Sequence, residues 1–251
     1  MEVTRVCTSR ASIIPFLIIP ILLGATTCEA QAPQFVGSWT VACCPDDISS
    51  NIHNQVYVAD SNRYLRKFDN LGHQLFLLAL PTGRVSGVDV ARDGTMFLVN
   101  EHADVCHEFA YTGDMVRTWG GNGSGDGQFD RPKRIARDDD GNLYVTEWGN
   151  DRLQKFDSSG SFLAKWDWGG RGGPTGVSVG PDGYLYVVLS SEGLLWKMTR
   201  DLQFVDSWAV GGRPRGVHAA DNGLVHVVDL NSAVETYDST GQLLARWGLA
   251  T

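Results

Sequence analysis

The apolar positions of this chain fall in short runs that are separated by polar turns. One such run is Tyr144-Val145-Thr146-Glu147, and related runs begin at Tyr57, Phe97, Tyr186 and His226. The aromatic or histidine residues that open these runs recur at intervals of roughly 40 to 47 residues. A fixed period of this size is typical of propellers, solenoids and other repeat arrays.

Each repeat contains four short segments, which the third repeat displays in full. Its first segment follows Pro132, a turn comes at Asp140-Gly141-Asn142, and the later segments include Leu153–Phe156 and end near Trp166. The segments are rich in Val, Tyr, Phe and Trp and are bounded by Gly, Asp and Asn, which predicts strands joined by tight turns. No helical period is present after residue 30. Four antiparallel strands per repeat predict the blade of a β-propeller.

The repeat has the pattern P-x-G-V-x-V-x-x-D-G-N-x-Y-V-x-D…R-x-x-x-F-x-x-x-G and resembles the NHL repeat. The third repeat carries the pattern best, including its lead-in Gly123–Pro132, and the resemblance covers nearly all of residues 35–248. The resemblance implies a propeller fold. It leaves the function open, because the family spans exported sensors, lyases, RNA binders and targeting domains of ubiquitin ligases.

The sequence departs from the repeat pattern in two innermost segments. Asp46-Asp47-Ile48 stands where apolar residues are usual, Arg134 occupies the glycine place of the third repeat, and Arg137 occupies an apolar one.

The sequence is compatible with two numbers of blades. Five NHL-like repeats are recognisable, and Phe35–Trp39 adds a segment that looks like a lone fourth strand. We therefore predict an all-β propeller of four-stranded antiparallel blades that is five-bladed or an incomplete six-bladed ring. An open ring would expose the faces of two blades, which favours a dimer.

The N-terminal segment is predicted to lie outside the propeller. Arg5 and Arg10 precede an apolar run at Ile13–Gly24, and small residues follow at Ala25–Ala30. This order matches an export signal, and the apolar run is short for a membrane span. We assign residues 1–30 to an export signal or short anchor and residues 31–251 to the propeller. The expected location is secreted, periplasmic or membrane-tethered outside the cytoplasm.

Three cysteines remain after the predicted signal. Cys106 aligns with Leu65, Leu153 and other apolar residues, so we expect it to be a buried core residue. Cys43 and Cys44 are adjacent and could form a strained disulfide, pair with other chains, or remain loop thiols.

Charge separates by face, because the strands of a meander alternate in direction. Loops that join the fourth strand to the first, and the second to the third, share one face, which we call the top. The net charge of −8 disfavours non-specific nucleic-acid binding. The top loops that enter the innermost strands carry basic residues: Arg84, Arg131, Lys133, Arg134, Arg171, Arg213 and Arg215. The outer top loops also contain the ring side chains of His102 and Trp148. Their acidic residues are Asp60, Glu101, Asp104, Glu147, Asp151, Glu192 and Asp229.

A basic rim at the mouth of the channel predicts binding of carboxylate, phosphate or sulfate groups, which guanidinium holds in bidentate fashion. Trp148 could add stacking or cation–π contacts. The alternative is that each arginine pairs with a carboxylate of a neighbouring blade, as we expect for Arg63 and Arg152.

Catalysis has weak support in the residues. Some relatives of the NHL type are metal-dependent lyases, yet here only His218 is a natural channel residue, which makes it a weak metal candidate. Zinc needs three or four converging ligands, and no HxH, HxxxH or CxxC spacing occurs. Gly120–Gly127 lacks the Lys-Ser/Thr and helix of a phosphate loop.

The sequence thus favours an exported, non-enzymatic scaffold that binds a protein, a peptide, or an anionic or glycan ligand on its top face without a cofactor. The alternative is a metal-dependent propeller lyase or hydrolase that holds zinc or calcium in the central channel. Contact with a membrane is expected only through the N-terminal segment.

Overall fold

The computed structural model describes residues 45–60, 62–80, 83–170, 172–230 and 233–248. The predicted export signal of residues 1–30, the strand expected at Phe35–Trp39 and the pair Cys43-Cys44 lie outside this part of the chain. Within it, no helix is long and apolar enough to cross a membrane.

The described residues form five sheets of four strands each. The first blade contains β1 (Pro45–Ser50), β2 (Val56–Asp60), β3 (Tyr64–Phe68) and β4 (Gln74–Ala79). The second contains β5 (Val85–Val90), β6 (Met96–Asn100), β7 (Val105–Phe109) and β8 (Met115–Gly120). The third contains β9 (Pro132–Arg137), β10 (Leu143–Glu147), β11 (Arg152–Phe156) and β12 (Phe162–Asp167). The fourth contains β13 (Pro174–Val179), β14 (Tyr184–Leu189), β15 (Leu194–Thr199) and β16 (Phe204–Ala209). The fifth contains β17 (Pro214–Ala219), β18 (Val225–Asp229), β19 (Ala233–Tyr237) and β20 (Leu243–Gly248).

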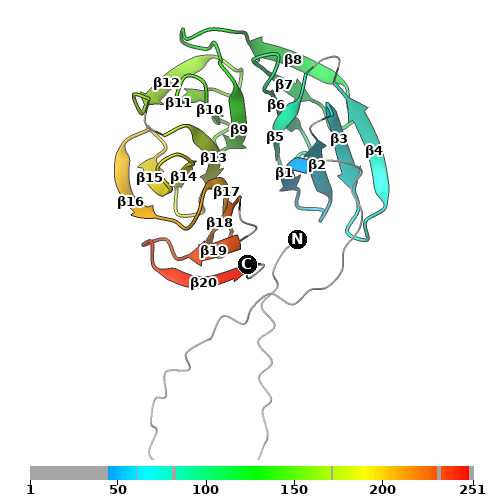
Figure 1. The fold of residues 1–251 in the computed structure, drawn as a ribbon. Helices are drawn as coiled ribbons and strands as arrows, with labels where there is room; N and C mark the ends of the chain where they lie inside the picture. The colour runs from blue at the N-terminus through cyan, green and yellow to red at the C-terminus, as the bar shows by residue number, and fades with distance from the viewer. Residues whose placement is uncertain (1–44, 61, 81–82, 171, 231–232, 249–251) are drawn as a thin grey trace, which may run out of the picture.

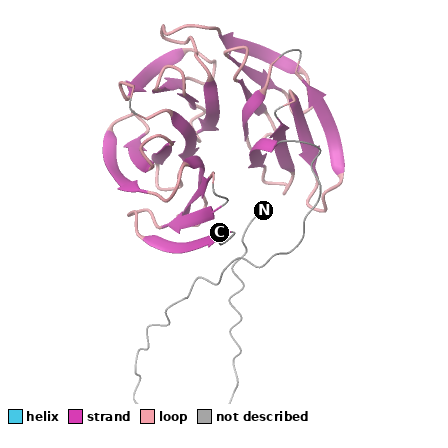
Figure 2. Ribbon diagram, in the orientation of Figure 1, coloured by secondary structure: helices cyan, strands magenta, loops and turns pink. Residues whose placement is uncertain are grey.

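Every sheet is an antiparallel meander whose strands pair in chain order. The five sheets are arranged around a centre, with β1, β5, β9, β13 and β17 innermost (Figures 1 and 2). Contact between innermost strands runs from β1 to β5, β9, β13 and β17 in turn. The predicted all-β propeller of four-stranded blades is confirmed, and the described residues give five blades. The alternative of an incomplete six-bladed ring is not confirmed.

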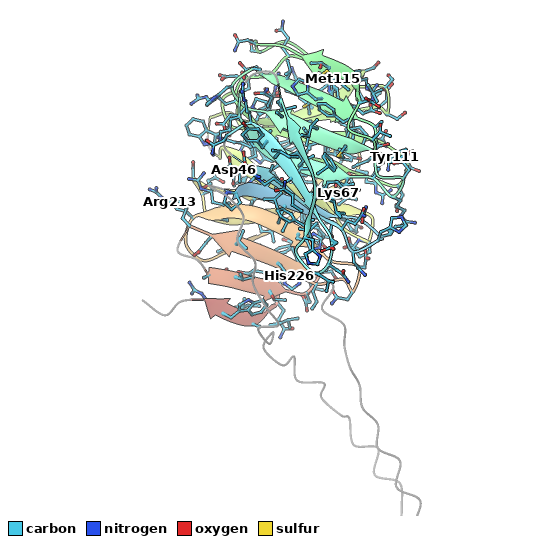
Figure 3. The ribbon with its side chains drawn as sticks, turned by 90° about the vertical axis from the view of Figure 1, so that its right-hand side faces the viewer. Asp46, Lys67, Tyr111, Met115, Arg213 and His226 are labelled. Atoms are coloured by element: carbon cyan, nitrogen blue, oxygen red, sulfur yellow. The ribbon has the colours of Figure 1, made fainter. Side chains whose placement is uncertain are left out.

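The loops that join the first strand to the second, and the third to the fourth, share the other face, which we call the bottom. The top and bottom faces lie on opposite sides of the molecule. In Figure 3, Arg213, in the loop that enters β17, and Tyr111, in the turn between β7 and β8, project from opposite edges. This arrangement agrees with the alternation of loops that the meander predicts.

The recurring aromatic of the second strand ties the core of a blade to its bottom turn. Tyr144 and Tyr186 are almost fully buried. Their hydroxyl groups donate hydrogen bonds to carboxylate oxygens of Asp138 and Asp182, at 2.9 and 2.8 Å. These aspartates sit in the turns between the first and second strands. The periodic tyrosine therefore supplies apolar bulk and also satisfies the buried end of its own ring.

Apolar side chains also fill the spaces between blades. Val99 and Cys106 of the second blade pack with Ile135, Val145 and Phe156 of the third. Cys106 is fully buried, as predicted, and burial raises the pKa of its thiol well above the usual value. A thiol with a raised pKa is a poor nucleophile, so Cys106 acts as a core residue.

The junction between the fifth and first blades differs from the other four. Within the described residues, β17 and β1 make no extensive contact of the kind that joins the other innermost strands. Val228 is 42% exposed, whereas its counterparts Val99 and Val188 are 0% exposed. Ile48 is 65% exposed, whereas its counterpart Ile135 is 4% exposed. The described blades therefore leave apolar surface uncovered at this one junction.

A buried ion pair fixes the long top loop that leads into the third blade. The side chains of Glu147 and Arg152 are 0% and 3% exposed, and Arg152 Nε lies 2.5 Å from Glu147 Oε1. Arg152 also donates to the carbonyl oxygens of Ser124, Gly125 and Gln128 at 2.7 to 3.0 Å. Arg152 therefore pairs with a carboxylate of its own blade, not of a neighbouring blade as expected, and it holds the loop against β11.

We predict that Glu147→Ala lowers the free energy of unfolding by about 3 to 5 kcal/mol, because it leaves the Arg152 charge buried without its partner. The matched control is Asp126→Ala in the same loop, which removes the half-exposed pair with Lys165 and should cost less than about 1 kcal/mol. Urea unfolding followed by tryptophan fluorescence measures both. Equal losses in the two variants would contradict the assigned role of the buried pair.

Candidate functional site

A β-bulge interrupts each innermost strand directly after its first residue. In the first blade, Pro45 pairs with Asp60 and Asp47 pairs with Ala59, so that Asp46 has no partner across the sheet. The same shift of register occurs in the other four sheets. We call the skipped residues the bulge residues: Asp46, Ser86, Lys133, Thr175 and Arg215. A bulge can re-aim a side chain out of the regular alternation of a strand.

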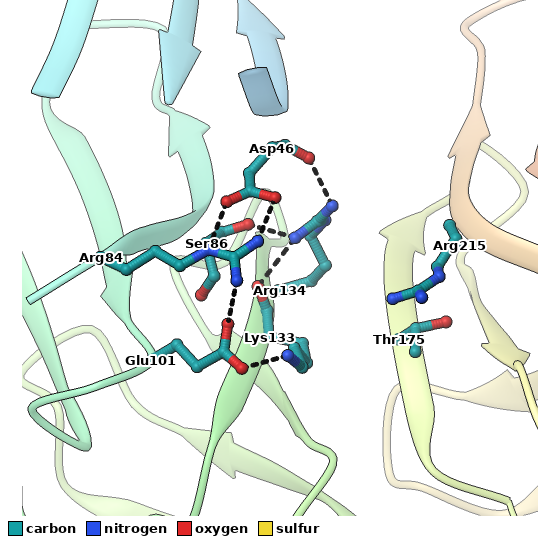
Figure 4. Close-up of a pocket in the computed structure, with 8 residues that line it drawn as sticks. All are labelled: Asp46, Arg84, Ser86, Glu101, Lys133, Arg134, Thr175 and Arg215. Carbon is teal, nitrogen blue, oxygen red and sulfur yellow. Dashed lines mark hydrogen bonds and ion pairs between the residues drawn. The ribbon is translucent and has the colours of Figure 1, made fainter. Parts of the chain in front are cut away.

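The bulge residues converge at the centre of the top face. All five line one small polar pocket, together with Arg84, Glu101 and Arg134 (Figure 4). Each blade therefore contributes one side chain from an equivalent position to the mouth of the channel. Four cations and two carboxylates stand in this lining.

Two of the bulge residues join neighbouring blades. Ser86 Oγ donates a hydrogen bond to the carbonyl oxygen of Pro132, and Thr175 Oγ1 donates to that of Pro214, both at 3.1 Å. The accepting proline is the first residue of the next innermost strand. Close approach requires glycine at the following position, since a Cβ on Gly87 would lie 2.7 Å from the carbonyl oxygen of Lys133.

Arg84 and Lys133 of the pocket are bound to carboxylates. Arg84 donates two hydrogen bonds of 2.6 Å to the carboxylate of Asp46, and its guanidinium lies 3.7 Å from Glu101 Oε2. The ammonium of Lys133 pairs with Glu101 Oε1. These pairs link the first, second and third blades across the rim.

Arg134 crosses the mouth of the channel from the third blade to the first. Its guanidinium donates to the carbonyl oxygen of Asp46 at 2.6 Å and to that of Ser86, and Nε lies 3.4 Å from Asp47 Oδ1. Burial raises the pKa of Asp47, and Arg134 opposes that rise. The register corrects the expectation that Asp46 and Asp47 stand at apolar positions: Asp46 is a bulge residue, and Asp47 and Arg134 both occupy the position that is glycine in the other three blades. The two departures therefore complement one another, because the arginine pairs with the aspartate.

Arg215 is the cation of the lining for which the described residues supply no ion-pair partner. It extends from β17 toward the pocket, beside Thr175, and faces the Arg84–Glu101–Lys133 cluster from the opposite side (Figure 4). The residue is exposed to solvent. Its guanidinium can therefore accept an incoming anion without first breaking an internal ion pair.

The other predicted top-face residues lie outside this pocket. Arg131 stacks on Trp148, with its guanidinium carbon 4.3 Å from the ring centroid, and Trp148 is 41% exposed. Arg213 is exposed, and it does not line the pocket. Arg171 falls outside the described residues. The structure thus brings together Arg84, Lys133, Arg134 and Arg215 and leaves Arg131 and Trp148 as a separate exposed pair.

The pocket also contains residues that the sequence did not single out as site residues. The sequence pattern does not distinguish Ser86 and Thr175, marks Asp46 only as a departure from the repeat, and predicts Glu101 in the acidic outer loops. A signal for these pocket residues is present in the sequence. In each of the five aligned repeats, the bulge residue directly follows the first residue of the innermost strand.

Within the described part of the chain, no three His, Cys, Asp or Glu side chains gather in a way that could hold a metal ion. His218 is exposed on β17 and pairs in register with His226, whose Nδ1 lies 2.8 Å from Thr236 Oγ1. Desolvation of the imidazole by the surrounding protein lowers the pKa of His218 below its usual value. These residues supply single imidazoles rather than a set of ligands.

This architecture defines a β-propeller with a polar, mainly cationic channel mouth. A model of the NHL repeat matches residues 129–156. NHL repeat-containing protein 3 of Mus musculus is 28% identical over 140 residues, which cover 49% of this chain and 40% of that protein. The chain thus spans less than half the length of this curated relative. The predicted resemblance to the NHL repeat is thus confirmed, with the match of the repeat model confined to residues 129–156.

Solved structures share the fold at low sequence identity. A streptogramin B lyase is 16% identical with a TM-score of 0.68, covering 82% of this chain and 69% of its own. A nidogen/laminin complex contains a chain that is also 16% identical with a TM-score of 0.69, covering 82% of this chain and 80% of its own. At these identities the likeness establishes the architecture alone.

Asp89 on β5 should give the protein a measurable pH dependence. Burial raises the pKa of Asp89 to about 6, and neighbouring Asp47 adds to the rise. The folded state therefore binds a proton more readily than the unfolded state, whose aspartate has a pKa near 4. The free energy of unfolding should decrease as the pH rises from about 4 to about 6. Asp89→Asn should remove this loss and gain on the order of 1 to 3 kcal/mol at pH 7.

The control is Asp93→Asn in the following turn, where hydrogen bonds from Thr95 hold the pKa of the carboxyl below its usual value. That variant should be less stable than the parent at pH 7, and the gap should close as the pH falls below about 4. Urea titrations across pH 4 to 7 test both signs. A pH profile unchanged by Asp89→Asn would contradict the assignment.

Proposed function

We propose that this protein is an exported, non-enzymatic binding scaffold whose top face holds a protein or peptide partner, with a carboxylate of the partner seated at Arg215. The observation that carries the proposal is the set of five bulge residues at the mouth of the channel. Export rests on the charged, apolar and small-residue order of residues 1–30.

The charges of the pocket support a ligand with one anionic group. Arg84, Lys133 and Arg134 already bind Asp46, Asp47 and Glu101, so these six groups form a neutral, hydrogen-bonded frame. Arg215 adds one positive charge beside that frame. A guanidinium can bind a carboxylate through two parallel hydrogen bonds, which is stronger and more specific than a single neutral contact.

The exposed pair of Arg131 and Trp148 supports a larger contact surface on the same face. Trp148 is held in place by Arg131 and by Gly173, where a Cβ would lie 2.7 Å from the indole ring. Exposed tryptophan and arginine side chains are frequent anchors of protein interfaces. The propeller in the nidogen/laminin complex is a further reason to consider a protein partner.

The alternative, a metal-dependent lyase with zinc or calcium in the channel, draws on the streptogramin B lyase likeness and on His218. That likeness extends to the fold only. The described residues add no specific ligand set to His218, so we keep the scaffold as the proposal. Elemental mass spectrometry of protein purified without chelators decides the matter, and one tightly bound metal per chain would favour the lyase.

We predict that a glutamate-rich peptide binds the protein and that Arg215→Glu weakens this binding at least about tenfold, because a charge-assisted hydrogen bond is worth about 1.5 to 3 kcal/mol. The matched control is Arg92→Glu, the same charge reversal in the bottom turn before β6, where Arg92 is 81% exposed. Isothermal titration calorimetry at two salt concentrations provides the affinities, and a serine-rich peptide serves as the uncharged probe.

Equal loss of affinity in both variants would show that net charge alone attracts the peptide and would overturn the site. No binding of the glutamate-rich peptide by the parent protein would overturn the proposed ligand chemistry.

A further inference from the structure

The top loop between β8 and β9 contains the tripeptide Asn122-Gly123-Ser124. An asparagine followed two residues later by serine or threonine, with any residue but proline between, is the acceptor sequence for N-linked glycosylation. The tripeptide lies outside the strands and outside the lining of the pocket.

The loop presents both chemical groups of the acceptor to solvent. The side chains of Asn122 and Ser124 belong to exposed residues. The backbone beneath them is fixed, since the carbonyl oxygen of Ser124 accepts a hydrogen bond of 2.7 Å from Arg152 and that of Gly123 accepts one of 2.9 Å from Asn150. The acceptor asparagine thus stands on a well-anchored surface loop.

The hydrogen bonding of Asn122 leaves room for a covalent substituent. Its Nδ2 carries two hydrogens and donates one of them to Asp104 Oδ2 at 2.8 Å. Asp104 Oδ1 accepts from the backbone N–H of Arg131, also at 2.8 Å. A sugar on Nδ2 replaces the second hydrogen only. The bond to Asp104 can therefore persist in the glycosylated, folded protein.

We propose that Asn122 is an N-glycosylation site of this protein. The donor class is an oligosaccharide linked to a lipid diphosphate. A bond forms between Asn122 Nδ2 and the anomeric carbon, the bond from that carbon to the diphosphate oxygen breaks, and the lipid diphosphate leaves. The amide proton passes to a base of the transferase, so no oxidant or reductant is needed. The proposal rests on the export that forms part of the proposed function, because the transfer takes place in the secretory pathway.

The glycan would stand on the top face beside the second and third blades. Asp104 links Asn122 to the backbone of Arg131, whose side chain stacks on Trp148. A partner that reaches Arg215 would then approach from the fourth and fifth blades, while the glycan covers the outer part of the opposite side.

The test is cell-free translation of the full chain with endoplasmic-reticulum microsomes, followed by protease protection and electrophoresis. The parent chain is expected to be protected and to migrate as one slower band that an N-glycosidase restores. Asn122→Gln and Ser124→Ala should abolish the slower band completely. Ser124→Thr, the conservative control, should keep it, since threonine preserves the acceptor sequence.

The outcomes separate glycosylation from export. A chain that is protected but migrates unchanged overturns the proposal and leaves export intact, and so does a slower band that persists in Asn122→Gln. A chain that is not protected contradicts export instead. The full chain is then translated behind a foreign signal peptide, where a band shift that depends on Asn122 supports the acceptor site and its absence overturns it.

Discussion

The contact between successive innermost strands is the constraint on which the rest of this propeller depends. Ser86 and Thr175 donate hydroxyl hydrogen bonds to the first carbonyl of the next blade. Gly176 allows that approach, because a Cβ there would lie only 3.2 Å from the Cα of Gly216. These short links bring the blades together at the centre, so the spaces farther out can be filled by apolar side chains. Between β17 and β1, where the innermost strands make no extensive contact, Val228 remains exposed.

The same β-bulge serves both architecture and chemistry. A residue skipped by the ladder can turn toward the neighbouring blade or toward the channel. Hydroxyl-bearing bulge residues join blades, and charged ones build the rim. Most rim charges neutralise one another through pairs such as Arg84 with Asp46, which gives a rigid mouth with little net attraction of its own. Arg215, at the junction where no described blade follows, retains its charge for a ligand.

The fold was largely predictable, because period, turn residues and strand composition all point to the same four-stranded unit. The sequence also located the basic residues of the top face, and it flagged Arg134 and Asp46-Asp47 as departures. It could not show that Arg134 pairs with Asp47, since the whole second blade separates these residues along the chain. Nor could the sequence distinguish the cations that form ion pairs from those that do not. That distinction depends on which carboxylate each side chain can contact in the folded protein, as Lys133 contacts Glu101.

The most direct test of the account is a crystal structure of the protein with the glutamate-rich peptide bound. The account predicts a peptide carboxylate within hydrogen-bond distance of the Arg215 guanidinium, with the pairs of Arg84 and Lys133 unchanged. A peptide bound at the bottom turns, or one that displaces Asp46 from Arg84 while leaving Arg215 in solvent, would contradict it.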